Sequence, residues 1–126
     1  MGPGLSLTIP GERRFLGVAR LLVGGLAARL DLPYEQMDDL QLAAESALAS
    51  EPPGNEVTLE LEVGEDGIEL RIGPFDRRSL NEDDRKGELG LDRLLSALVD
   101  RVDVVQQDGS DWLVLEKRVA LPGDGD

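Results

Sequence analysis

The sequence contains neither cysteine nor histidine. Their absence excludes thiol nucleophiles, disulfides, imidazole bases and the usual zinc sites. Any enzyme built from this chain would have to use Asp, Glu, Lys, Ser, Thr or Tyr side chains. Aromatic residues make up only 3% of the chain, whereas 40% of the residues are hydrophobic. We therefore expect a folded domain with an aliphatic core.

Basic residues are outnumbered by acidic ones, 13 to 26, which gives a formal net charge of −13. The electrostatic field of this negative charge would repel nucleic acid and anionic membranes and attract a basic protein surface. Acidic charge that only keeps the domain soluble is the alternative. No apolar run is long enough to span a membrane, and Met1–Ser6 lacks the basic start of a signal peptide. These absences predict a cytoplasmic protein.

Two periodicities organise the chain into eight elements. Apolar residues that alternate with polar ones predict five strands, at Leu5–Ile9, Val57–Val63, Ile68–Ile72, Val102–Gln106 and Trp112–Val119. Helical spacing predicts three helices: Glu12–Leu30, a second from about Pro33 to the stop at Glu51-Pro52-Pro53-Gly54, and a third opened by Gly87–Gly90 with Leu91, Leu94, Leu95, Leu98 and Val102 on its apolar face.

Turn and loop signals connect these elements. Residues 64–67 and 108–111 predict hairpin turns, and residues 73–86 predict a loop. Asp31 or Leu32 is expected near the cap of the second helix. Gly24 and Gly25 either weaken the first helix or allow a neighbouring element to pack closely against it.

The resulting order, β-α-α-β-β-α-β-β, predicts an α+β fold. We expect a two-layer sandwich in which about three helices cover one face of a mostly antiparallel mixed sheet, while its other face stays polar. The length of 126 residues suits one domain, over residues 1–121, followed by a short acidic tail at 122–126.

Four segments in this order resemble the RsbW-type anti-sigma-factor kinases of the GHKL, or Bergerat-fold, histidine-kinase-like ATPase superfamily. The segments are Ala19-Arg20-Leu21, Asp38–Glu45, Gly87–Leu91 and the closing strand Trp112–Val119. The resemblance runs from about Leu5 to Val119. It implies a protein that holds a sigma factor inactive, phosphorylates a STAS-domain antagonist with Mg-ATP, and forms a homodimer.

The resemblance also implies three nucleotide boxes, of which two have lost their key side chains. In the first, Glu45 matches the family's base, but Ala49 occupies the position of the Asn that ligates Mg²⁺, and a methyl group cannot bind a hard cation. In the second, Pro74 replaces the Asp that reads adenine, with Asp76 as a displaced substitute. Two such losses should weaken nucleotide binding by orders of magnitude.

The third box keeps its outline. Gly87, Leu89 and Gly90 retain the shape of a phosphate loop that opens a helix, although Glu88 brings negative charge towards a polyanion. A loop that simply needs flexible backbone is the alternative interpretation. The acidic run at residues 81–84 lacks the spacing of a calcium loop, so we expect no metal site.

The resemblance points to Arg20 as the partner-binding residue, because family members contact the sigma factor and the antagonist with an Arg at this point. Arg13, Arg14 and Phe15 precede it by one or two turns and would extend the same face. An ordinary exposed Arg and a helix start are the alternatives.

Three hypotheses remain at this stage. The first is a non-catalytic regulator that binds a sigma factor or a STAS-domain antagonist, with no cofactor and with Glu45 as a vestigial base. The second is a working serine/threonine kinase in which Asp76 and Glu45 help to bind Mg-ATP. The third is an accessory interaction domain without any link to sigma factors.

Overall fold

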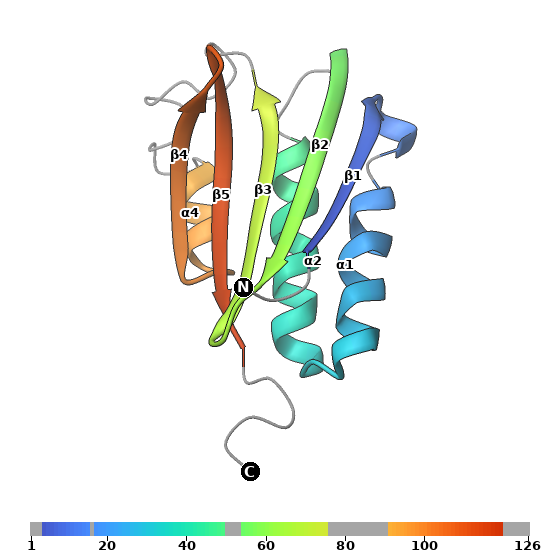
Figure 1. Cartoon of the computed structure of the whole chain (residues 1–126), viewed down its shortest axis with the longest axis vertical. Coiled ribbons are helices and arrows are strands. Elements are labelled where there is room, and N and C mark those ends of the chain that lie inside the picture. Colours follow the sequence, from blue (N-terminus) through green and yellow to red (C-terminus); the bar gives the residue numbers. More distant parts are fainter. Residues whose placement is uncertain (1–3, 16, 50–53, 76–90, 120–126) are drawn as a thin grey trace.

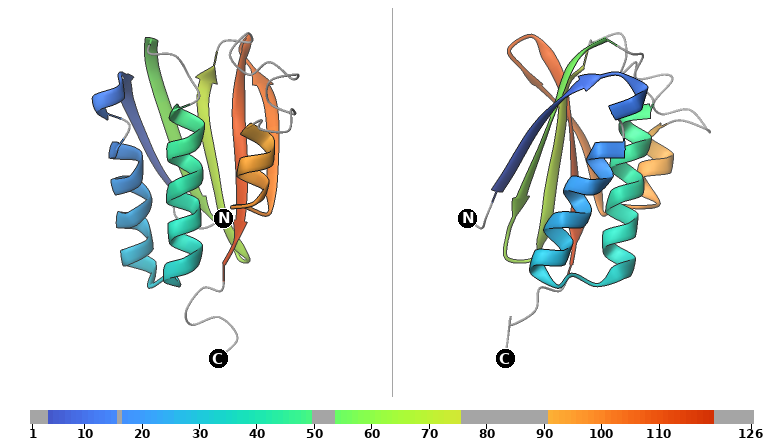
Figure 2. Two further views of the ribbon diagram at one scale, coloured as in Figure 1. Left: turned by 180° about the vertical axis from the view of Figure 1, so that it is seen from behind. Right: turned by 90° about the vertical axis from the view of Figure 1, so that its right-hand side faces the viewer.

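The computed structural model describes residues 4–15, 17–49, 54–75 and 91–119. Its elements follow the predicted order: β1 (Gly4–Gly11), a 3₁₀ turn η1 (Arg13–Phe15), α1 (Gly17–Leu30), α2 (Tyr34–Ala49), β2 (Gly54–Val63), β3 (Gly67–Phe75), α4 (Leu91–Ser96), β4 (Arg101–Gln107) and β5 (Ser110–Arg118). Helices α1, α2 and α4 cover one face of the sheet (Figures 1 and 2). The predicted two-layer α+β fold is confirmed.

The five strands form one sheet in the order β1-β2-β3-β5-β4. All four neighbouring pairs are antiparallel, so the largely antiparallel sheet is confirmed and the described strands include no parallel pair. The end of β3 and the β4–β5 hairpin lie at the same end of the sheet (Figure 1). The two-residue turn of that hairpin has Asp108 at φ 53° and Gly109 at φ 80°, as a tight hairpin requires.

The core lies between the sheet and the helices α1, α2 and α4. Alternate residues of the central strands, among them Leu59, Leu70 and Leu113, are fully buried, because successive side chains of a strand point to opposite faces. The small residues Ala43, Ala44 and Ala47 of α2 are also fully buried and let the helix approach the sheet closely. Among the described residues, the core is aliphatic apart from Phe75.

A short link joins α1 to α2. Asp31 has a φ of 52°, and the Leu32 N–H donates a hydrogen bond to the Ala27 carbonyl at 3.1 Å, which is the Schellman ending of α1. The Met37 N–H donates to the Pro33 carbonyl at 3.1 Å and starts α2. Asp31 therefore closes the first helix, whereas we predicted it or Leu32 near the cap of the second.

Several predicted boundaries are wrong for identifiable reasons. The first helix is interrupted, since η1 ends at Phe15 and α1 starts at Gly17. Strand β3 continues to Phe75 through Pro74, which we had assigned to a loop. Pro74 has no N–H, but it lies within a register irregularity between Ile72 and Phe75, where the ladder does not need one.

The third helix is shorter than the apolar spacing predicts. It ends at Ser96, so residues beyond it leave the helical phase. Leu95 is fully buried, but Leu94 is 48% exposed and Val99, which we had not placed on the apolar face, is buried. The predicted loop beyond Phe75 and the helix start at Gly87–Gly90 lie outside the described residues.

Candidate functional site

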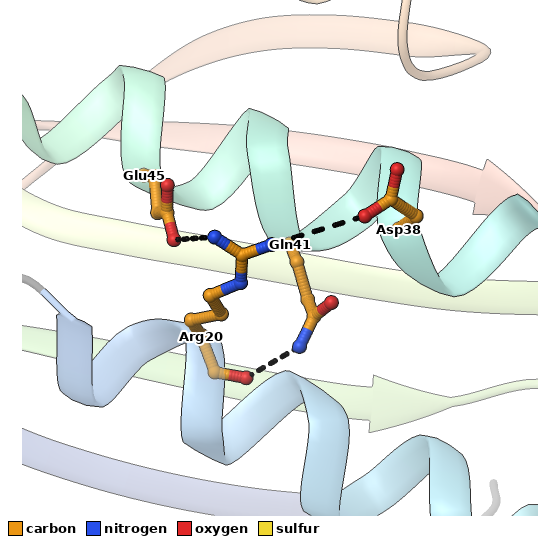
Figure 3. Close-up of polar contacts among 4 residues, drawn as sticks. All are labelled: Arg20, Asp38, Gln41 and Glu45. Carbon is orange, nitrogen blue, oxygen red and sulfur yellow. Dashed lines mark hydrogen bonds and ion pairs between the residues drawn. The ribbon is translucent and has the colours of Figure 1, made fainter. Parts of the chain in front are cut away.

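The predicted partner residue Arg20 forms ion pairs with α2. Its Nη1 lies 3.1 Å from Glu45 Oε1 and its Nη2 lies 4.0 Å from Asp38 Oδ1, as Figure 3 shows. Gln41 lies between these carboxylates along α2 and donates from Nε2 to the Arg20 carbonyl at 2.8 Å. We call these four residues the Arg20 cluster. Sequence reasoning singled out Arg20 and Glu45 separately and did not predict that they meet.

Helical geometry explains why the cluster forms. Asp38, Gln41 and Glu45 are separated by three and four residues, so they share one face of α2. On α1, Gly24 faces the same contact: a Cβ atom at this position would lie only 2.9 Å from Gln41 Nε2. A Cβ at position 24 would therefore displace only the flexible end of the Gln41 side chain, and Gly25 has open space around it.

The Arg20 cluster lies at the protein surface. The side chains of Arg20 and Asp38 are 55% and 47% exposed, and that of Glu45 is 30% exposed. An ion pair this exposed contributes only about 0.2–1 kcal/mol to stability. Its larger effect is to hold the guanidinium in a defined place while leaving half of it accessible.

Two apolar side chains are exposed beside the cluster. Leu21, next to Arg20 on α1, is 74% exposed, and Leu42, next to Gln41 on α2, is 46% exposed. Single exposed leucines are ordinary, but apolar groups that neighbour an accessible arginine are a common composition of protein interfaces. Helices α1 and α2 thus expose one cation and two apolar side chains close to it in sequence.

The other predicted partner residues lie in and around η1. Arg14 is placed over the Phe15 ring at 5.0 Å and within 3.5 Å of Glu12, so its charge and its aromatic neighbour are already paired. The side chain of Arg13 is outside the described part of the structure. No ion pair or hydrogen bond among the described residues joins Arg14 or Phe15 to the Arg20 cluster.

Three positions of the predicted nucleotide boxes lie within the described residues. Glu45 is paired with Arg20, Ala49 is the exposed last residue of α2, and Pro74 is exposed in β3. Asp76, Gly87, Leu89 and Gly90 lie outside the described residues. Among the residues that are described, no group of three or more acidic side chains could hold a metal ion.

Sequence reasoning missed a buried carboxylate on β5. Asp111 is only 8% exposed, and its Oδ1 has no hydrogen-bond partner within the described structure. An unpaired buried acceptor costs about 1–3 kcal/mol of stability. The alternation of Leu113 and Leu115 could have shown that Asp111 shares their face, but we had placed residues 108–111 in a turn.

The chain is similar in sequence to bacterial serine-protein kinases. The serine-protein kinase RsbW of Halalkalibacterium halodurans is 27% identical over 126 residues, which cover 83% of this chain and 77% of the relative. The serine-protein kinase RsbW of Listeria monocytogenes is 27% identical, with 83% of this chain and 81% of the relative covered. No family model matches the chain.

A solved structure shows the same fold. The RsbU and RsbW domains of Rv1364c from Mycobacterium tuberculosis superpose with a TM-score of 0.72 at 13% identity, covering 95% of this chain. This chain spans 33% of that solved chain.

The element order and this superposition show a fold of the Bergerat type. The chain is also similar in sequence to the RsbW serine-protein kinases, at 27% identity. No helix within the described ranges is long and apolar enough to cross a membrane.

Proposed function

We propose that this chain is a non-catalytic regulator of the RsbW type, which binds a sigma factor or a STAS-domain antagonist through the outer surface of α1 and α2. One observation carries the proposal: the Arg20 guanidinium is half-exposed on helices α1 and α2, which also expose Leu21 and Leu42. A sigma factor held at this surface would be kept from RNA polymerase by occlusion. The net charge of −13 favours a partner with a basic surface.

The absence of phosphoryl transfer is proposed from the residues at two box positions. Ala49 offers no oxygen one turn after Glu45, and a Mg²⁺ ion needs oxygen ligands in near-octahedral arrangement. Glu45 Oε1 accepts a hydrogen bond from Arg20 Nη1 at 3.1 Å, and this ion pair competes with any role of Glu45 as a base. Exchange of partners would then depend on something other than the chain's own kinase activity.

A working serine/threonine kinase is the second candidate. The observation in its favour is that the relatives at 27% identity are named serine-protein kinases. In this case Glu45 would act as the base and Asp76 would replace the missing adenine acceptor, with Mg-ATP as cofactor. An accessory interaction domain without a link to sigma factors is the third candidate.

The first experiment is affinity capture from a lysate of the source organism, followed by mass spectrometry. Arg20→Glu should lose a sigma factor or STAS-domain protein that the wild type retains, because the new carboxylate repels the partner's acceptors and leaves no cation. Arg29→Glu is the matched control, since Arg29 is an exposed residue near the end of the same helix. Retention of every partner by Arg20→Glu would refute the interface.

The second experiment tests phosphoryl transfer with the captured partner. The purified pair is incubated with labelled Mg-ATP, and we expect no label on the partner and none on the chain. Label on a Ser or Thr of the partner would establish the kinase alternative. Capture of neither a sigma factor nor a STAS-domain protein would favour the accessory domain.

A further inference from the structure

The open face of the sheet offers a second surface for a partner. Helices α1, α2 and α4 lie on the other face, and the open face is turned to the viewer in Figure 1. Two adjacent hollows, of about 390 and 380 Å³, lie on this face and share Glu62 and Glu69 among the residues that line them. We call the two hollows together the open-face depression, which extends across β1, β2, β3 and β5.

A row of three glutamates crosses this depression. Glu69 of β3 lies directly opposite Glu62 of β2 and Glu116 of β5. Because neighbouring strands are about 4.8 Å apart, the row places three carboxylates within about 10 Å. Directly opposed like charges destabilise a sheet, and natural folds depart from the stabilising pattern mainly where a surface has a function. The row is therefore a candidate for binding a cationic group.

The cations that line the depression do little to neutralise the row. Arg71 is paired with Glu60, a fourth glutamate of the same face, at 3.6 Å. Lys117 turns to the helical side of the sheet, where its Nζ lies 3.1 Å from Asp39 Oδ2. Arg118 is then the one lining cation without an ion pair to any described residue. The depression therefore keeps an excess of negative charge.

An apolar area borders the row on β5. Val114, two residues before Glu116, is 6% exposed although it lies outside the main core cluster, and it shares the open face with Trp112. Trp112 lies so close to Gly73 that a Cβ there would be 2.6 Å from the indole ring. Lysine and arginine suit this border, because their aliphatic stems pack on apolar surface while their charged ends reach carboxylates.

The sign of the charge decides between the possible occupants. Nucleic acid and anionic lipid would be repelled. A second copy of the chain would bring the same row of glutamates and the same net charge of −13. The described residues contain no group of three acidic side chains placed to hold a metal ion. An extended basic segment fits, since its alternate side chains lie about 6.8 Å apart on one side and can form charge-assisted hydrogen bonds with the row.

We propose that the open-face depression binds a basic segment of a partner protein, whose lysine or arginine side chains pair with Glu62, Glu69 and Glu116. This surface lies on the opposite side of the sheet from the helices that carry the Arg20 cluster. The inference therefore goes beyond the proposed function and does not depend on it. With two separate surfaces, the chain can hold two partners, or two parts of one partner, at the same time.

The test measures the affinity of a dye-labelled peptide that alternates lysine and serine, by fluorescence anisotropy at about 0.1 M salt. The wild type should bind it saturably and should not bind the same peptide with glutamine in place of lysine. Glu69→Lys should weaken binding about tenfold or more, because a cation in the middle of the row repels the peptide. The same variant should be more stable than the wild type, since two like-charge pairs are removed, so unfolding cannot explain the loss.

Glu35→Lys is the matched control, because it makes the same change of charge at an exposed position at the start of α2, on the helical side. Its affinity for the peptide should stay within about twofold of the wild type, since only the general field of the protein changes. In amide NMR spectra of the wild type, the peptide should shift signals of β2, β3 and β5 and leave those of α1 and α2 in place.

Several results would overturn the proposal. They are the absence of saturable binding, equal weakening by Glu35→Lys and Glu69→Lys, and NMR shifts confined to the helices. Self-association of the wild type in sedimentation experiments, abolished by Glu69→Lys, would show that a second copy occupies the depression instead. Arg20→Glu should bind the peptide at least as tightly as the wild type, so failure here is distinguishable from failure of the proposed function.

Discussion

Replacing Glu69 with lysine is expected to stabilise the fold, because Glu69 lies between two other glutamates on the open face of the sheet. It pairs directly with Glu62 of β2 and with Glu116 of β5. Like charges at directly opposite positions of antiparallel strands are destabilising. Glu116 has some compensation from Arg101, at 3.8 Å on β4, whereas no ion pair to Glu62 or Glu69 is found among the described residues.

The size of the effect follows from the number of cross-strand pairs that change. Each such pair contributes about 0.2–1 kcal/mol, and Glu69→Lys converts two repulsions into two attractions. Allowing for the exposure of these side chains, we expect a gain of about 1–3 kcal/mol in the free energy of unfolding. For a domain of this size that gain raises the melting temperature by about 3–10 °C.

Urea denaturation at low and high salt measures this gain and separates its cause. Salt shortens the Debye length from about 10 Å at 0.1 M to about 3 Å at 1 M, so most of the gain should disappear at high salt. Glu65→Lys is the control, since it makes the same charge change in the exposed β2–β3 turn, outside the row of glutamates. Glu69→Gln should give about half of the gain, because it removes the repulsions without adding attractions.

Two results would contradict this reasoning. If Glu65→Lys stabilises the protein as much as Glu69→Lys does, the gain comes from the lower net charge and not from the cross-strand pairs. If Glu69→Lys has no effect at low salt, the three carboxylates do not interact across the strands as their register requires.

Two further substitutions test the packing of β5. Gly73→Ala should destabilise the fold by about 1–3 kcal/mol, because the new Cβ would lie 2.6 Å from a carbon of the Trp112 ring; unchanged urea denaturation followed by Trp112 fluorescence would contradict it. Lys117→Met should cost about 1–3 kcal/mol, since it removes the bonds to Asp39 and the Leu98 carbonyl. An unchanged melting temperature would show that these two bonds contribute nothing net.

The order of the elements could be predicted from the sequence because each carries a strong periodicity. Strand β2 alternates apolar and polar residues along Val57–Val63, and α2 repeats apolar residues at helical spacing from Leu40 to Leu48. These patterns depend only on which face is buried. The aliphatic core and the charged residues of the open face follow from the same patterns, although that face also carries Trp112 and Val114 of β5.

The element boundaries that were predicted wrongly depend on tertiary contacts, which a local sequence pattern does not contain. A proline usually ends a strand, but Pro74 lies in a register irregularity, where the ladder needs no N–H. Asp31 resembles an N-cap in sequence, yet its positive φ places it at the end of the preceding helix. Leu94 fits the apolar spacing, but α4 ends at Ser96 and turns Leu95, not Leu94, into the core.

The candidate site was predictable only one residue at a time. The resemblance selected Arg20 and Glu45, which are 25 residues apart, but their 3.1 Å contact requires the packing register of α1 on α2. Gly24, whose role was left open between a weak point and a close approach, lies at this contact, next to the flexible end of the Gln41 side chain. Asp111 was missed because a turn signal, Asp-Gly-Ser-Asp, covers the start of a strand.

Under the proposed function, the pairing of Arg20 with two carboxylates of its own chain would make partner binding an exchange of ion pairs. Glu45 and Asp38 compete with any incoming acceptor at the high effective concentration that a shared fold provides. The free energy that a partner would gain from Arg20 is therefore only the difference between the new ion pair and the existing one. The lifetime of such a complex would be set mainly by contacts with Leu21 and Leu42, and its affinity would depend on ionic strength less than the large net charge suggests.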